Sequence, residues 1–215
     1  KSSDRLTVAV SYRAEGSEEY RILALNGIPQ PDKKEQPSYQ EVGGTSSTGE
    51  FVTVLASIFK PESQTKFETV DTDLLRGRRC IVYSFNIKRE NSKQTISTKD
   101  VIEQSTISGS SGKIWIDREL DRVLRVESNA TEIPTDFPVK AASRIIDYDW
   151  VIITDRKYLL PVNSDVRLTS RYDRQLYETR NQIAFRNYQK YGTDVRILDD
   201  DDEVVEETPV NVTKP

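Results

Sequence analysis

Two aspartates on one expected strand are the residues whose types and spacing could do chemistry. Asp147 and Asp149 lie two positions apart in an alternating run, so both carboxylates point to the same face of the strand. Paired carboxylates can exchange protons with a substrate or hold a hard cation. No glycosidase or metal motif surrounds this pair. We therefore expect a solvated strand face, with Tyr148 and Trp150 directed into the core.

Two further segments have the composition of ligand-binding loops. Residues 43–49 (GGTSSTG) have the glycine and hydroxyl content of a phosphate-binding loop, but they lack its Gly-Lys-Ser/Thr ending. Residues 199–202 are consecutive aspartates without the glycine-containing spacing of a calcium loop. We expect a connecting loop and a solvated acidic segment, with no metal site and no cofactor.

The composition excludes several kinds of catalysis. Histidine is absent, which excludes Ser-His-Asp and Cys-His catalytic groups and histidine-containing zinc sites. Cys80 is the only cysteine, so no internal disulfide forms, and its apolar neighbours predict a buried thiol. We therefore expect no catalytic residues and a protein that is not an enzyme.

Charge and hydropathy restrict the partners. The 215 residues carry a net charge of −4 without a basic stripe, so nucleic acid is not an expected partner. No apolar run reaches the roughly 18 residues of a membrane-spanning helix. Methionine is absent even from position 1. We expect that processing or trimming removed the upstream start, with any signal or anchor.

One amphipathic helix is expected over residues 47–59. Ser47 and Glu50 have the spacing of a capping box that would start this helix, and Pro61 would stop it. An apolar stripe with helical spacing is formed by Phe51, Val54, Leu55, Ile58 and Phe59.

The rest of the chain alternates like successive hairpin strands. Residues 173–191 contain good helix formers, but the alternation from Asn181 onward favours a strand. Trp115 is expected on the opposite sheet face from Ile114 and Ile116. Two further strands each place apolar side chains on one face, namely Ile81, Tyr83, Phe85 and Ile87 on the first and Leu124 and Val126 on the second.

About ten short strands and one early helix predict a mainly β fold of the α+β type. A meander of this length must curl, because a flat sheet leaves long exposed edges. We expect a curved antiparallel open half-barrel with the helix as a lid on its concave face. Residues 1–198 would form this single domain, and residues 199–215 a disordered acidic tail.

Several segments carry a family resemblance. Residues 112–117 (GKIWID) and 122–127 (RVLRVE) resemble the central hairpin of the outer-membrane lipoprotein carrier (LolA/LolB-like) fold. Residues 147–151, 158–162 and 185–188 are similar to a group of uncharacterised bacterial secreted proteins with that fold. The resemblance covers most of residues 4–198, its motifs are structural, and the N-terminal helix of the family is missing.

This resemblance implies an extracytoplasmic protein, periplasmic or peripherally associated with the outer membrane, that binds a lipid or lipoprotein acyl chain. A curved sheet cannot fill its concave side with its own side chains, so an apolar cavity should remain under the helix. The alternative is a structural or protein-interaction module of the cell envelope with a fully packed interior. The sequence sets no oligomeric state. The expected ligand-binding residues are Phe51, Val54, Leu55, Ile58, Phe59, Ile81, Tyr83, Phe85, Ile87, Leu124 and Val126.

Overall fold

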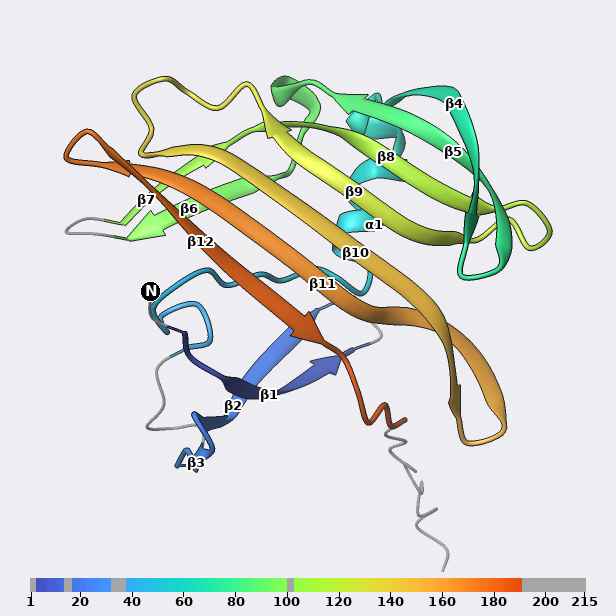
Figure 1. Ribbon diagram of the computed structural model, residues 1–215, viewed down its shortest axis with the longest axis horizontal. Helices are drawn as coiled ribbons and strands as arrows, with labels where there is room; N and C mark the ends of the chain where they lie inside the picture. Colours follow the sequence, from blue (N-terminus) through green and yellow to red (C-terminus); the bar gives the residue numbers. More distant parts are fainter. Residues whose placement is uncertain (1–2, 14–16, 32–37, 100–102, 191–215) are drawn as a thin grey trace, which may run out of the picture.

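The computed structural model describes residues 3–13, 17–31, 38–99 and 103–190 (Figure 1). Within these ranges the protein is mainly β, with antiparallel sheets and one α-helix, α1 (Thr53–Phe59). No helix there is long and apolar enough to cross a membrane. The acidic tail expected over residues 199–215 lies outside the described residues, as does a short final strand that the apolar residues within 195–198 predict.

The largest sheet has seven strands in the order β12-β11-β10-β9-β8-β5-β4. Every neighbouring pair in it is antiparallel. Its members are β4 (Lys66–Leu75), β5 (Arg78–Ile87), β8 (Gly109–Asp117), β9 (Val123–Thr131), β10 (Val139–Ile153), β11 (Arg156–Tyr172) and β12 (Gln175–Ala184).

The expectation of about ten strands in one sheet is wrong. β1 (Leu6–Tyr12), β2 (Glu18–Leu25) and β3 (Ile28–Pro29) form a separate sheet, as do β6 (Thr95–Lys99) and β7 (Glu103–Ile107). The reason lies in the connections. A long loop, α1 and a short 3₁₀ turn, η2 (Pro61–Ser63), separate β3 from β4, and a second turn, η3 (Arg89–Asn91), diverts the chain after β5. Neither segment continues the hairpin succession.

Three hairpin corners have the backbone that two-residue loops prefer. Both central residues have positive φ at Asn26-Gly27, at Arg76-Gly77 and at Asp173-Arg174. This is the type I′ pattern, whose twist matches that of the strands it joins. The corners therefore fix the register of β2–β3, β4–β5 and β11–β12.

An apolar cluster joins α1 to one face of the seven-stranded sheet, which we call the helix-side face. Val54, Leu55 and Tyr83 pack against this cluster from its edges. Burial of each large apolar side chain stabilises the fold by roughly 1.5–3 kcal/mol. The buried members are Ile58, Phe85, Ile87, Ile114, Val126, Ile146 and Tyr148.

A second apolar cluster lies on the opposite face, the outer face, and contains Cys80, Val82, Trp115 and Leu124. Trp115 is only 8% exposed, and it alternates along β8 with Ile114 of the helix-side cluster. The expectation that the tryptophan faces away from Ile114 is confirmed, as is the buried thiol of Cys80.

The placement of Leu124 beside Val126 on the concave face is wrong. Trp115 pairs with Arg125 but Ile116 pairs with Val123, so Leu124 is the extra residue of a β-bulge. A bulge breaks the two-residue alternation, and Leu124 packs into the outer cluster while Val126 remains in the helix-side cluster.

The helix is shorter than expected at its start. Gly49 has φ +90°, outside helical geometry, and α1 begins only at Thr53, without a side-chain cap at Val52. The side chains of Ser47 and Glu50 do hydrogen-bond, but in the core rather than as a helix cap. At the other end α1 stops at Phe59, as Pro61 predicts.

The strand expected from Asn181 onward is confirmed only as far as Ala184, and the expectation is wrong for residues 185–190. β12 pairs with β11 from Asn163↔Ala184 to Tyr172↔Gln175. The strand starts earlier than the alternation indicated, and residues 185–190 continue as irregular chain. This last segment returns to the core, where the Phe185 amide donates to the Val162 carbonyl over 3.0 Å.

Candidate functional site

A cavity of about 360 Å³ lies between α1 and the helix-side face of the sheet. Its position is the one expected for an apolar ligand, at the contact of helix and sheet. Most of its walls are apolar or aromatic, and two charged side chains complete them. The lining residues are Phe51, Leu55, Phe59, Ile116, Asp121, Arg122, Val123, Tyr148 and Leu159.

The helix contributes one row of its apolar stripe to this cavity. Leu55 and Phe59 are four residues apart in α1, so they lie along one side of the helix, and Phe51 lies in the turn that precedes the helix. Ile58 instead faces the buried cluster. The stripe is therefore divided between holding the helix in place and enclosing the cavity.

The sheet forms the floor of the cavity where two of its strands separate. β9 and β10 pair only as far as Arg125↔Asp147. Beyond this pair, Val123 at the start of β9 and Tyr148 on β10 both face the cavity. The space between the diverging strands is therefore not filled by a cross-strand neighbour.

Aromatic side chains close the Phe51 end of the cavity. The ring of Phe51 contacts Phe185 and Tyr188 edge-on, with centroids 5.5 and 6.2 Å away, and lies parallel to Tyr12 at 6.1 Å. Such arrangements are favourable beyond the area they bury. At the other end Phe59 is 46% exposed and stacks on Phe67 at 5.6 Å. The Phe59 end is thus the more accessible one.

A buried polar group anchors the segment that enters the helix. Glu50 is fully buried, its Oε1 accepts hydrogen bonds from the hydroxyls of Ser47 and Ser164, and its backbone carbonyl accepts one from Tyr148 at 2.9 Å. Burial raises the pKa of the Tyr148 hydroxyl, which keeps it a donor at neutral pH. Tyr148 thus connects the cavity lining to the segment that precedes α1.

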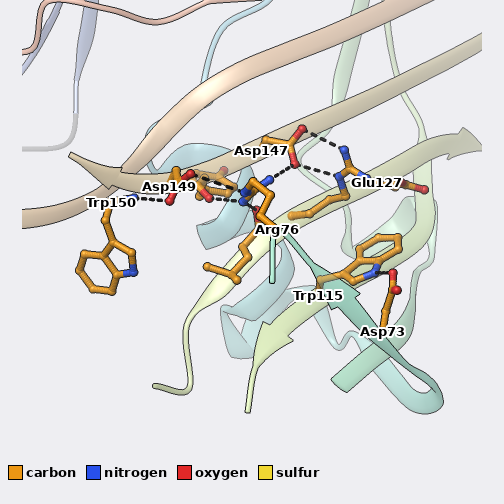
Figure 2. Close-up of polar contacts among 10 residues, drawn as sticks. Asp73, Arg76, Trp115, Glu127, Asp147, Asp149 and Trp150 are labelled. Atoms are coloured by element: carbon orange, nitrogen blue, oxygen red, sulfur yellow. Dashed lines mark hydrogen bonds and ion pairs between the residues drawn. The ribbon is translucent and has the colours of Figure 1, made fainter. Parts of the chain in front are cut away.

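The two aspartates singled out by their spacing belong to a charged network on the outer face (Figure 2). Asp147 accepts two hydrogen bonds from Arg125, at 2.9 and 3.0 Å, and one from Arg76 at 2.9 Å. Asp149 lies 3.5 Å from the Arg76 guanidinium. Both carboxylates therefore have cationic partners, and the geometry favours a structural role for the pair.

Arg76 occupies the outer side of the gap between β9 and β10. Its Nη2 donates to the backbone carbonyls of Leu124 and Tyr148, at 3.2 and 2.6 Å. These carbonyls lie just beyond the last β9–β10 pair. The guanidinium therefore takes the place of ladder hydrogen bonds where the β9–β10 pairing has ended.

Trp115 extends the same network towards the sheet edge. Its indole N–H donates to Asp73 over 2.9 Å and lowers the pKa of that carboxyl. The guanidinium of Arg125 lies 5.9 Å from the indole ring centre, within cation–π range. The outer face therefore carries a continuous series of directional contacts from β4 to β10.

The expected ligand-binding residues occupy four kinds of position, and Leu55 belongs to two of them. Phe51, Leu55 and Phe59 line the cavity. Ile81 pairs with Ile116 and so shares the helix-side face, although it lies outside the cavity lining. Leu124 lies on the outer face. Those that pack in or against the helix-side cluster are Val54, Leu55, Ile58, Tyr83, Phe85, Ile87 and Val126.

Sequence reasoning missed several lining residues. Ile116 and Val123 form a cross-strand pair whose shared face could be read from the alternation of β8. No local pattern predicts Leu159, Asp121 or Arg122, because their position depends on where neighbouring strands and the β8–β9 turn end.

A second cavity, of about 390 Å³, lies beside the β9–β10 connection and includes Lys140 and Arg171 in its lining. The ammonium of Lys140 donates to the carbonyls of Thr135 and Phe137, each at 2.7 Å. This cation therefore holds the connecting loop. Among the described residues no group of three or more potential metal ligands comes together.

Comparison of the chain with protein-family models, with curated proteins and with solved structures found no match.

Proposed function

We propose that this protein is a non-enzymatic binding protein that holds an acyl chain or another apolar ligand between α1 and the sheet. The observation that supports the proposal is the cavity of about 360 Å³, whose lining includes Leu55 and Phe59 of α1 and Phe51 from the turn before it. Such a volume lies at the low end of the roughly 300–1,000 Å³ typical of small-molecule sites.

The finer architecture that we propose is an open half-barrel with α1 as a lid. The seven-stranded sheet bends around the helix in Figure 1, and the helix packs on one face of it. The lid is short and its Phe59 end is half-exposed, so opening at that end would disturb few contacts. The extracytoplasmic location, with peripheral outer-membrane association, rests on the family resemblance.

The proposal is tested by binding of a fluorescent fatty acid, followed by displacement with unlabelled dodecanoate. Val123→Trp would place a large side chain in the cavity floor and should weaken binding at least about tenfold, since contact with several methylene groups is lost. Ile145→Trp is the matched control. Ile145 is exposed, and its cross-strand partner on β9 is Glu127, which is not a member of the helix-side cluster. Absence of binding by the unmodified protein would refute the proposal.

A second candidate function, an interaction module of the cell envelope, is favoured by a different observation. The β10–β11 hairpin continues past its last pairings with β9 and β12, and Figure 1 shows it projecting from the sheet. Ile152 near its tip is 67% exposed. A photo-crosslinker placed at residue 152 would capture a protein partner in envelope fractions, whereas a site facing only water would yield no specific product.

A further inference from the structure

The exposed charged part of the cavity lining, which we call the mouth, consists of two opposite charges on one turn. Asp121 and Arg122, between β8 and β9, are both exposed and both line the cavity. Within the described chain, no ion pair joins these two side chains. Nη1 of Arg122 donates to the carbonyls of Leu120 and Asp121, at 3.4 and 3.2 Å. These bonds hold the guanidinium at the mouth and occupy one of its two terminal nitrogens.

Asp117 holds the turn that presents these charges. Its Oδ1 accepts from the amides of Glu119 and Leu120, at 2.9 and 3.1 Å, and its other oxygen pairs with Arg78. The Asp121 amide donates to the Asp117 carbonyl at 3.0 Å. A turn fixed in this way positions both charges before a ligand arrives, which reduces the ordering cost of binding.

The two charges select a headgroup that carries both signs. A guanidinium matches phosphate oxygens with two parallel donors, and a carboxylate attracts an ammonium group. A simple carboxylate headgroup would be attracted by Arg122 but repelled by Asp121. A cationic headgroup would be attracted by Asp121 but repelled by Arg122. A phosphate linked to an ammonium group satisfies both side chains.

The apolar part of the ligand is limited by the volume. At about 360 Å³ the cavity is near the lower limit for small-molecule sites, which suits one acyl chain rather than two or three. Its walls offer apolar and aromatic surface along the whole row from Phe51 to Phe59. The ligand therefore combines one chain with a small zwitterionic headgroup.

We propose that the cavity binds a single-chain zwitterionic amphiphile of the lysophospholipid type, with its phosphate on Arg122 and its ammonium on Asp121. This inference rests on the proposed function, and it adds the headgroup chemistry and the number of chains.

Four dodecyl amphiphiles with the same chain test it, each used below its critical micelle concentration in displacement of the fluorescent fatty acid. The headgroups are phosphocholine, carboxylate, trimethylammonium and maltoside. We expect dodecylphosphocholine to bind most tightly, by about threefold over each of the others, because exposed charge contacts contribute roughly 0.2–1 kcal/mol each.

Charge-removing variants assign the contacts. Arg122→Gln should reduce dodecylphosphocholine binding about threefold and leave dodecyl maltoside unchanged, while Asp121→Asn should improve dodecanoate binding by a similar factor. Arg118→Gln and Glu119→Gln are the controls, because they make the same charge changes in the same turn outside the cavity lining.

Equal binding of all four amphiphiles, or identical effects of the control variants, would overturn the headgroup proposal while the apolar-site proposal stands. A higher affinity for a two-chain phospholipid would overturn the single-chain part. Failure of every amphiphile to bind would refute the proposed function itself.

Discussion

The two faces of the seven-stranded sheet are built from the same strands but by different kinds of contact. The helix-side face is apolar and ends in a cavity, whereas the outer face combines an apolar cluster with a network of Asp, Arg and Trp side chains. Apolar contacts are non-directional, while hydrogen-bonded ion pairs require a defined geometry. The directional contacts of the outer face can therefore fix the positions of the strands, while the helix-side face contains the cavity.

The register shows how the outer face achieves this. Val82, Trp115, Arg125, Asp147 and Asn163 are successive cross-strand partners on β5, β8, β9, β10 and β11. Contacts between such partners are the main side-chain contribution to sheet stability. The row crosses the sheet next to the point where β9 and β10 separate, so it holds the strands together beside the cavity.

The largest expected effect lies on the helix-side face. Phe85→Ala would remove a buried ring from the apolar cluster and should cost about 3–5 kcal/mol, seen as a fall in melting temperature of about 10 °C. The loss should be the same at low and high salt, because no charge is involved. Ser84→Ala is the control on the adjacent, outward-facing position. A loss below about 1 kcal/mol would mean that this cluster is not the stabilising core.

A smaller, salt-dependent effect is expected on the outer face. Asp147→Asn would leave Arg125 and Arg76 without their shared carboxylate and should cost about 1–3 kcal/mol in urea unfolding. The cost should shrink only in part in 1 M salt, because the Asp147 side chain is 15% exposed and partly buried pairs are screened less than exposed ones.

Asp149→Asn provides the matched control. The Asp149 side chain is 49% exposed and its contact with Arg76 is longer, so we expect a loss of about 0.5 kcal/mol or less. Equal losses for both variants would contradict the distinction between the mostly buried carboxylate of Asp147 and the half-exposed carboxylate of Asp149. A metal-dependent rise in melting temperature, absent from the double variant, would contradict the structural role of the pair.

The acid dependence of stability sharpens the same contrast. The ion pair with Arg78 is the main cause that holds the pKa of Asp117 below its usual range. The folded state therefore favours the ionised form of Asp117. The contribution of this ion pair to the free energy of unfolding is complete above the unfolded-state pKa of about 3.9, and it is lost as the pH falls through the lower pKa of the folded state. Arg78→Gln should lower the melting temperature at pH 6, and this difference should narrow below about pH 4. Arg79→Gln, at an exposed position, should show no such convergence.

The smallest effect is expected at the accessible end of the lid. Phe59→Ala should cost about 1 kcal/mol, because the ring is half-exposed and mainly stacks on Phe67. Release of the fluorescent fatty acid should accelerate in this variant, as measured by stopped flow. A loss comparable with that of Phe85→Ala would show that the lid is as firmly held as the core.

Patterns that depend on neighbouring residues were predictable from the sequence. The periodicity of the stripe predicts α1 and its end at Phe59, and alternation predicts that Ile114 and Trp115 face opposite sides. The start of the helix was mispredicted because Ser47 and Glu50 match a capping box. A positive φ at Gly49, which the pattern does not reveal, delays the helix to Thr53.

Features that depend on distant segments were not predictable. The bulge that turns Leu124 outward is set by pairing between β8 and β9. The role of Arg76 requires the ends of β9 and β10 to lie beside a corner that precedes them by many residues. The cavity lies where the β9–β10 pairing ends. The point at which two strands stop pairing depends on residues far apart in the sequence, so no local pattern predicts it. The mouth residues, Asp121 and Arg122, therefore carry no sequence signal of their own.

The hydrogen bonds of Arg76 also have a consequence for the order of folding. Asp147 follows Arg76 by 71 positions in the sequence, and Tyr148, whose carbonyl accepts from Arg76, follows it by 72. These bonds cannot form until β8, β9 and β10 are in place. Contacts of this kind are expected after the rate-limiting step, since loop closure must precede them. Their loss would leave the refolding rate nearly unchanged and increase the unfolding rate. Arg76 would then contribute to kinetic stability, because its contacts determine the lifetime of the assembled sheet rather than the rate at which the sheet forms.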